Sequence, residues 1–107
     1  MILTGKAKED FLTKMSILTE IKDKKDLEEY FMKISDLIKN AYYVDFFDSV
    51  GIYIEVYRHN NRPTVQGFNS RIVRRINGYY ECCIAVNTRK EATEQAIKKA
   101  NEIFNSK

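Results

Sequence analysis

The chain has 107 residues, of which 44% are hydrophobic and 31% charged, and its net charge is +3. This length suits one domain (1–107), this composition excludes a disordered or fibrous chain, and no apolar run approaches the roughly 20 residues that cross a bilayer. The first residues lack the apolar segment and cleavage site of a secretory signal, so we expect a cytoplasmic location.

The positive charge is concentrated in the middle of the chain. Residues 1–57 carry eight lysines and eleven acidic residues, whereas residues 58–90 carry six arginines and Lys90 against Glu81. A guanidinium binds phosphate or carboxylate with two hydrogen bonds and stacks on aromatic rings. The central region is therefore expected to gather its arginines on one outward side and to meet an anionic or acidic macromolecule there, although the net charge alone is too small to indicate nucleic-acid binding.

Two helices are predicted before residue 42. The first spans about residues 5–21, with Thr4 as the N-cap and apolar residues at three- and four-residue spacing. Asp23–Asp26 interrupts that pattern and begins a second helix, whose unbroken apolar stripe is expected to pack on a sheet. The segment Tyr42–Phe47 is interpreted as a connection. The first stripe comprises Phe11, Leu12, Met15, Leu18 and Ile21, and the second comprises Leu27, Tyr30, Phe31, Ile34, Leu37, Ile38 and Ala41.

From Val50 the apolar period changes to two, which is typical of a half-buried β-strand. If the residues alternating from Val50 to Val56 face the helices, Tyr53 and Tyr57 lie beside Glu55 on the other face and form a candidate contact face. The following segment, Arg58–Pro63, is predicted to be a turn. Two arginines and His59 on one loop suit phosphate contact, and a solvated loop without any such role is the alternative.

A second strand is expected at about residues 64–76, and Asn77-Gly78 predicts a two-residue turn into a third strand. In that register Arg74 faces Glu81 as an ordinary cross-strand ion pair, while no acidic residue stands opposite Arg71 or Arg75. Arg71 and Arg75 are therefore the preferred candidates for ligand contact.

The last helix is predicted to start with a capping box formed by Thr88 and Glu91. Arg89 and Lys90 occupy its first turn, where cations oppose the helix dipole and a bound phosphate would reverse that cost. The complete pattern predicts an α+β fold of order α-α-β-β-β-α, with a three-stranded antiparallel sheet and the helices packed on one of its faces. The buried stripe of the last helix comprises Ala92, Ala96, Ile97, Ala100, Ile103 and Phe104.

Motifs of known enzyme chemistry are absent from the sequence, which contains no Gly-rich phosphate loop, serine elbow or Cys/His nucleophile pair. We therefore expect no enzyme and no cofactor. Neighbouring Cys82 and Cys83 are interpreted as small hydrophobic residues, and with His59 as the sole histidine a zinc site is not expected. Two alternatives are a metal-binding cluster of Asp45, Asp48 and Glu55, and an enzyme pocket in which Tyr53, Tyr57, Glu55 and His59 converge.

The order helix, three strands, helix from Leu27 to Phe104 resembles the double-stranded RNA-binding domain, and Asn87–Ala92 is similar to that family's basic entry into its last helix. The resemblance implies that these basic residues grip phosphates across the RNA major groove, while the loop Arg58–Pro63 enters the minor groove. The sequence departs from the family pattern at Thr93, where a further lysine is usual, and it lacks the family's glycines before the last helix.

Three other segments, Leu3–Phe11, Val44–Ile54 and Ala96–Asn105, resemble segments of small phage and prophage proteins. That resemblance implies a non-enzymatic inhibitor of host defence, similar to anti-CRISPR proteins, which binds a host CRISPR effector of the RNA-targeting type VI class or its guide RNA. An independent duplex-RNA-binding module is the alternative, and a homodimer through the tyrosines stays open. The predicted contact residues are Arg58, His59, Arg62, Arg71, Arg75, Arg89 and Lys90, with Tyr53 and Tyr57 as a further contact face.

Overall fold

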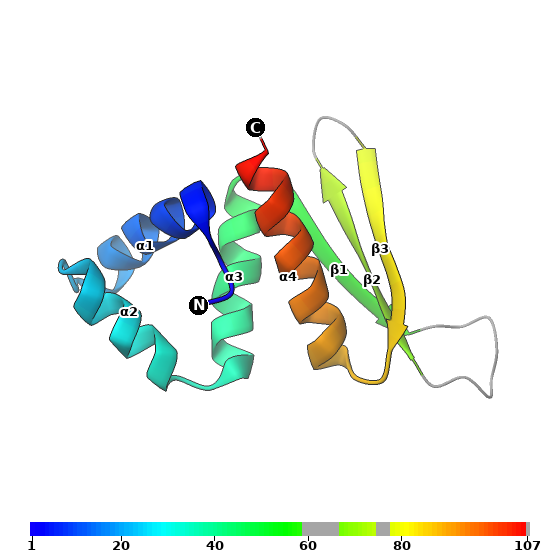
Figure 1. Ribbon diagram of the computed structural model, residues 1–107, viewed down its shortest axis with the longest axis horizontal. Coiled ribbons are helices and arrows are strands. Elements are labelled where there is room, and N and C mark those ends of the chain that lie inside the picture. Colours follow the sequence, from blue (N-terminus) through cyan, green and yellow to red (C-terminus); the bar gives the residue numbers. More distant parts are fainter. Residues whose placement is uncertain (59–66, 75–77, 107) are drawn as a thin grey trace.

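Three layers make up the molecule, as Figure 1 shows for the computed structural model. The structure describes residues 1–58, 67–74 and 78–106, and within 78–85 it describes the backbone only. The α+β class expected from the sequence is confirmed. The elements in chain order are α1 (Gly5–Thr19), α2 (Lys24–Lys33), α3 (Asp36–Ser49), β1 (Ile52–Arg58), β2 (Phe68–Arg74), β3 (Gly78–Val86) and α4 (Arg89–Asn105).

The helices form two of the three layers. The strands make an antiparallel sheet of order β1-β2-β3. Helices α3 and α4 pack on one face of this sheet, while α1 and α2 form an outer layer that packs on α3 and α4 (Figure 1). Burial of Ile52 and Ile72 marks the sheet face that the helices cover. The helix that begins near Asp23 therefore does not pack on the sheet, contrary to expectation.

An aromatic cluster joins the helical layers. The ring of Phe11 in α1 lies 5.1 Å from the rings of Phe31 in α2 and Tyr43 in α3, measured between centroids. Phe46 of α3 lies 5.6 Å from Phe11 and 5.8 Å from Phe104 of α4. The contacts of Phe11 with Phe31 and with Phe46 are edge-to-face, and such contacts add to the free energy gained by burying the rings. The cluster thus connects all four helices around Phe11, which is fully buried.

The predicted second helix is two helices. Ile34 has an extended backbone (φ −78°, ψ 163°), and the Ser35 hydroxyl oxygen accepts a hydrogen bond from the backbone N–H of Ile38 at 3.4 Å. Ser35 is therefore the N-cap of a new helix, with Asp36 in its first turn where an acid is favourable. The break ends α2 at Lys33 and changes which residues of the apolar stripe reach the core.

Helix α3 buries a different set of residues from the one predicted. Leu37 and Ile38, expected in the core, are 81% and 49% exposed. Tyr43, Phe46 and Phe47 are buried instead, at the three- and four-residue spacing of a helix. The interpretation of Tyr42–Phe47 as a connection was wrong because these aromatic positions continue the turn of the helix that starts at Ser35.

Two asparagine side chains of α4 accept hydrogen bonds from backbone N–H groups at the start of α1. The Oδ1 of Asn101 accepts a hydrogen bond from the Thr4 N–H at 2.9 Å, and the Oδ1 of Asn105 accepts one from the Ala7 N–H at 2.9 Å. Thr4 is the N-cap residue as predicted, but its side chain makes no cap hydrogen bond to α1. Gly5 has a φ of 58°, and a Cβ there would lie 3.2 Å from Asn105, so glycine suits this close approach.

The start of α4 follows the sequence closely. The Thr88 Oγ1 accepts a hydrogen bond from the Glu91 N–H at 3.1 Å, which confirms Thr88 as the predicted N-cap. The Thr88 hydroxyl also donates to the Glu91 carboxylate at 3.3 Å. The predicted buried stripe is also confirmed in full.

The register of β2 and β3 differs from the prediction by three residues. Gly78 stands opposite Arg74 and Arg71 opposite Glu81, so Gly78 belongs to strand β3 and the expected two-residue turn is wrong. Asn77 lies outside the described residues. An odd shift exchanges the two faces of a strand. In the observed register Glu81 therefore stands opposite Arg71 and not, as predicted, opposite Arg74.

Candidate binding surfaces

The seven predicted basic contacts do not form one surface among the residues that the structure describes. His59, Arg62 and Arg75 lie outside the described residues. Arg58 is exposed at the end of β1, and Arg89 and Lys90 begin α4 on the helical side of the sheet. Arg71 belongs to the opposite side, because its strand neighbour Ile72 faces the helices. The expectation of guanidinium groups gathered on one side is therefore wrong for the described arginines.

Arg71 has an acidic partner, contrary to prediction. Its Nε forms an ion pair with Oε2 of Glu55, the residue directly opposite on β1, and Glu81 is its neighbour on β3. The Arg71 guanidinium also lies 5.4 Å from the centroid of the Tyr57 ring. This distance permits a cation–π interaction. The prediction failed because it considered only β3 opposite Arg71, placed β3 in the wrong register from the turn at Asn77-Gly78, and assigned no register to β1, which carries Glu55.

The sheet face that points away from the helices carries the predicted tyrosines. Tyr53 and Tyr57 alternate with the core-facing Ile52 and Ile54, as the sequence predicts, and both tyrosines are half-buried. In Figure 1 all four helices lie on the other side of the sheet, so no described element covers this face. We call it the open face and define it by Tyr53, Glu55 and Tyr57 of β1 with Asn69, Arg71 and Val73 of β2.

The first turn of α4 has contacts of its own. The Arg89 guanidinium lies 5.0 Å from the centroid of the Phe68 ring at the start of β2. The Nζ of Lys90 lies 2.8 Å from a carboxylate oxygen of Asp36, at the start of α3. The hydrogen bond and charge of Lys90 lower the pKa of Asp36, and Asp36 in turn raises the pKa of Lys90. Lys90 is thus already neutralised by a carboxylate of this chain.

An apolar groove of about 510 Å³ lies between α3 and the first turn of α4. Sequence reasoning missed it because it assigned Leu37 and Ala41 to the core. Leu37, Ala41, Val44 and Asp48 recur at three- and four-residue spacing, a second stripe beside the buried one, and this spacing was a readable signal. We call this feature the α3 groove; its lining residues are Leu37, Asn40, Ala41, Val44, Asp45, Asp48, Arg89, Lys90 and Thr93.

The far end of the α3 groove is acidic. Burial and then the neighbouring charge of Asp45 raise the pKa of Asp48, while Lys14 of α1 opposes this shift. The Nζ of Lys14 lies 3.8 Å from the carboxylate of Asp45. Two like charges three residues apart on a helix repel each other. The α3 groove therefore has Arg89, beside the Lys90–Asp36 ion pair, at the start of α3 and an acidic end three turns later.

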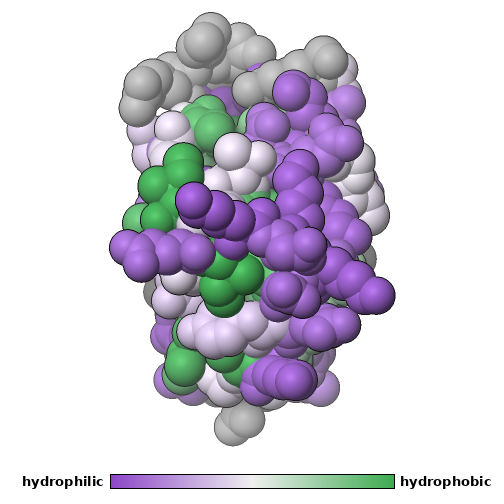
Figure 2. All heavy atoms as spheres, turned by 90° about the vertical axis from the view of Figure 1, so that its left-hand side faces the viewer, coloured by the Kyte–Doolittle hydropathy of each residue, from purple (hydrophilic) through white to green (hydrophobic). Residues whose placement is uncertain are grey.

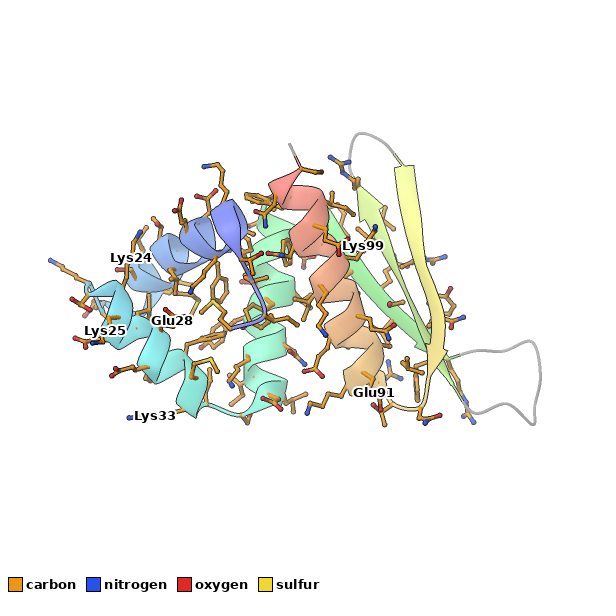
Figure 3. All side chains as sticks on the ribbon, viewed as in Figure 1. Lys24, Lys25, Glu28, Lys33, Glu91 and Lys99 are labelled. Carbon is orange, nitrogen blue, oxygen red and sulfur yellow. The ribbon has the colours of Figure 1, made fainter. Side chains whose placement is uncertain are left out.

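The outer layer has a mixed surface. Figure 2 views α1 and α2 from outside and shows hydrophilic side chains interspersed with smaller hydrophobic patches. Ile17, Leu18 and Met32 are among the exposed apolar residues. In Figure 3 the side chains of Lys25 and Lys33 project outward from α2, on the side of the molecule opposite the sheet. These lysines thus do not extend the basic character of the central region.

The acidic residues considered for a metal site are on separate surfaces. Asp45 and Asp48 line the α3 groove, whereas Glu55 pairs with Arg71 on the open face. Among the side chains that the structure describes, those of residues 1–58, 67–74 and 86–106, no three metal-ligating groups come together. None of the described helices has the length and apolar character needed to cross a membrane. Comparisons of the chain with family models, curated proteins and solved structures found no match.

Proposed function

We propose that this chain is a non-enzymatic binding protein that inhibits a host RNA-guided nuclease in the host cytoplasm, as phage anti-CRISPR proteins do. The open face supports the proposal most directly, because no described helix covers a sheet surface that carries two tyrosines and an arginine. The inhibitor class is inferred from the phage-like segments of the sequence. Binding alone would account for the activity, with no chemical step.

The open face has the composition of a protein-binding surface. Tyrosine and arginine are enriched at the centres of protein interfaces, where they provide most of the binding free energy. The Glu55 ion pair and the Tyr57 ring together fix the position of the Arg71 guanidinium. A side chain that is ordered before binding loses less entropy on association. Because Glu55 offsets the charge of Arg71, we assign this face to the effector protein rather than to its guide RNA.

Inhibition by the purified protein is the first test. The protein is added to purified type VI effectors with and without guide RNA, and both retention on beads and RNA cleavage are measured. We expect Tyr57→Ala and Arg71→Ala each to weaken binding by about 30-fold or more, as expected for interface anchors.

The matched control is Tyr30→Ala. Tyr30 is a tyrosine of comparable size that is 45% exposed on α2, on the other side of the molecule. This variant should inhibit as the unmodified chain does. The proposal is abandoned if the unmodified protein neither binds nor inhibits any of the effectors, or if Tyr30→Ala and Tyr57→Ala lose inhibition equally.

Duplex-RNA binding is the second candidate, and one observation favours it. Arg58 ends β1 directly opposite Phe68, and Arg89 lies over the Phe68 ring, so two exposed arginines meet at one end of the sheet. The pairing of Lys90 with Asp36 counts against it. This candidate predicts binding of bare duplex RNA that weakens steeply with salt, by about one unit of log–log slope for each lost phosphate contact. Salt-independent retention on RNA would exclude it.

A further inference from the structure

The α3 groove has opposite charges at its two ends. Lys90 contacts Asp36 at the first residue of α3, so the neighbouring Arg89 lies at the beginning of that helix and supplies the positive charge there that is not paired with Asp36. Asp45 and Asp48 lie in its last turns. Between them the groove is apolar, and Ala41 is the smallest side chain of the stripe. The charge pattern therefore reverses its sign about the middle of α3.

An apolar strip accompanies the groove. Leu37 is 81% exposed, and a second hollow of about 440 Å³ beside it is lined by Leu37, Ile38, Ala41, Tyr42 and Asp45. A single exposed leucine is ordinary on a protein surface. Here Leu37 joins two adjoining hollows on the same helix, and contiguous apolar surface of this kind marks interaction sites. The strip thus extends along the exposed side of α3 and needs a partner of matching shape and charge.

We propose that the α3 groove is the interface of a homodimer, in which α3 of one copy packs antiparallel on α3 of a second copy about a two-fold axis near Ala41 and Val44. A two-fold axis requires a self-complementary surface. Because the rotation reverses the direction of α3, the acidic end of one copy meets the basic end of the other. The small side chain of Ala41 lets the helix axes approach to about 8–10 Å, and Leu37 of each copy enters the groove of the other.

The charged residues that line the α3 groove favour a second copy of this chain over other binding partners. A lipid surface is disfavoured, because the acidic Asp36, Asp45 and Asp48 face outward on α3 and anionic headgroups repel them. In the dimer, Arg89 of the second copy approaches Asp48, whose only nearby cation in this chain is Lys14 among the described interactions. The open faces lie on the opposite side of the helices and stay accessible, so the dimer is independent of the proposed function and adds a second binding face to it.

The first test measures the oligomeric state of the full chain. Sedimentation velocity from low micromolar to near-millimolar protein should show a monomer converting to a dimer, because an interface of this small size is a weak one. Leu37→Glu and Ala41→Glu should stay monomeric throughout. Both residues are exposed, so circular dichroism should show unchanged secondary structure.

A charge exchange tests the antiparallel arrangement. Asp48→Lys alone and Arg89→Glu alone should each be monomeric, because like charges then meet across the axis. When the two variants are mixed, the introduced lysine faces the introduced glutamate and the native Asp48 faces the native Arg89. We therefore expect the mixture to form heterodimers. Glu29→Lys and Lys98→Glu, which make equal charge changes at exposed positions outside the groove, should dimerise as the unmodified chain does.

Three results would overturn the proposal. The first is an unmodified chain that stays monomeric up to near-millimolar concentration. The second is a dimer that survives Leu37→Glu but is lost in Tyr57→Ala, which would place the interface on the open face. The third is a failure of the mixed charge variants to associate although both are folded, which would exclude the antiparallel two-fold.

Discussion

The helical half and the sheet use their aromatic residues for different purposes. Phe11, Phe31 and Phe47 are fully buried, and Phe11 and Phe31 contact each other ring to ring. Tyr53 and Tyr57 are only half-buried and lie next to the Glu55–Arg71 ion pair. Buried rings without polar groups stabilise a fold, whereas half-buried rings beside charges contribute little to it and remain available for contact. Stability and binding should therefore be separable by mutation.

Removal of the Phe11 ring is expected to have the largest effect on stability. Phe11→Ala leaves a cavity where four helices meet, and we expect it to lower the free energy of unfolding by about 3–5 kcal/mol. Urea unfolding followed by circular dichroism measures the loss. Phe11→Leu, which keeps most of the volume, should lose clearly less. A loss below about 1 kcal/mol for Phe11→Ala would show that the cluster is not the centre of the fold.

Alkaline pH tests the same cluster through Tyr43. Burial raises the pKa of Tyr43 to about 12, against a backbone hydrogen bond with Ile2 that lowers it. The folded state therefore keeps this proton at pH values where the unfolded state has released it. The stabilisation is complete below pH 10, the unfolded pKa, and is lost as the pH rises through 12. We expect a loss of roughly 2–3 kcal/mol across this range.

Tyr43→Phe isolates this contribution from the other tyrosines. The difference in unfolding free energy between Tyr43→Phe and the unmodified chain should grow in favour of the variant above pH 10. Equal pH dependence in both proteins would mean that Tyr43 titrates normally and is not sealed in the core.

The smallest effect on stability is expected from a substitution on the open face. Glu55→Gln removes the charge that pairs with Arg71, and exposed ion pairs contribute about 0–1 kcal/mol. We therefore expect the urea midpoint to change little, while inhibition of the effector changes more because Arg71 loses one of the contacts that position it. A destabilisation close to that of Phe11→Ala would remove the distinction between the two regions.

The sequence predicts those parts of the fold that local patterns decide. Thr88 and Glu91 lie three residues apart and cap α4 as expected, and the alternation at Ile52 and Ile54 places the tyrosines on the open face. At the start of α4 the cap and the apolar pattern predict the same helix, and in β1 the apolar alternation alone predicts the strand. The α+β class follows from these helix and strand patterns.

The errors arose where two local signals disagreed. The apolar spacing continues through Ser35, but the Ser35-Asp36 cap starts a new helix that buries Tyr43 and Phe47. The turn signal at Asn77-Gly78 conflicted with a strand pairing that is decided by both neighbours of β2. Each error moved a candidate site: the first concealed the α3 groove, and the second concealed the position of Glu81 opposite Arg71. The Ser35 cap is visible in a short sequence window, whereas the register of β2 depends on long-range pairing that such a window does not contain.

The hydrogen bonds from α4 asparagines to the start of α1 join parts of the chain that are synthesised at different times. Thr4 and Asn101 are separated by 97 positions, and Thr4 and Asn105 by 101. Elongation usually proceeds at about 5–20 residues per second. Asn101 and Asn105 therefore leave the ribosome roughly 5–20 s after Thr4, their hydrogen-bond partner. During that interval α1 has no α4 to pack against. Newly made chains are therefore exposed to chaperones and proteases at this surface until α4 has emerged.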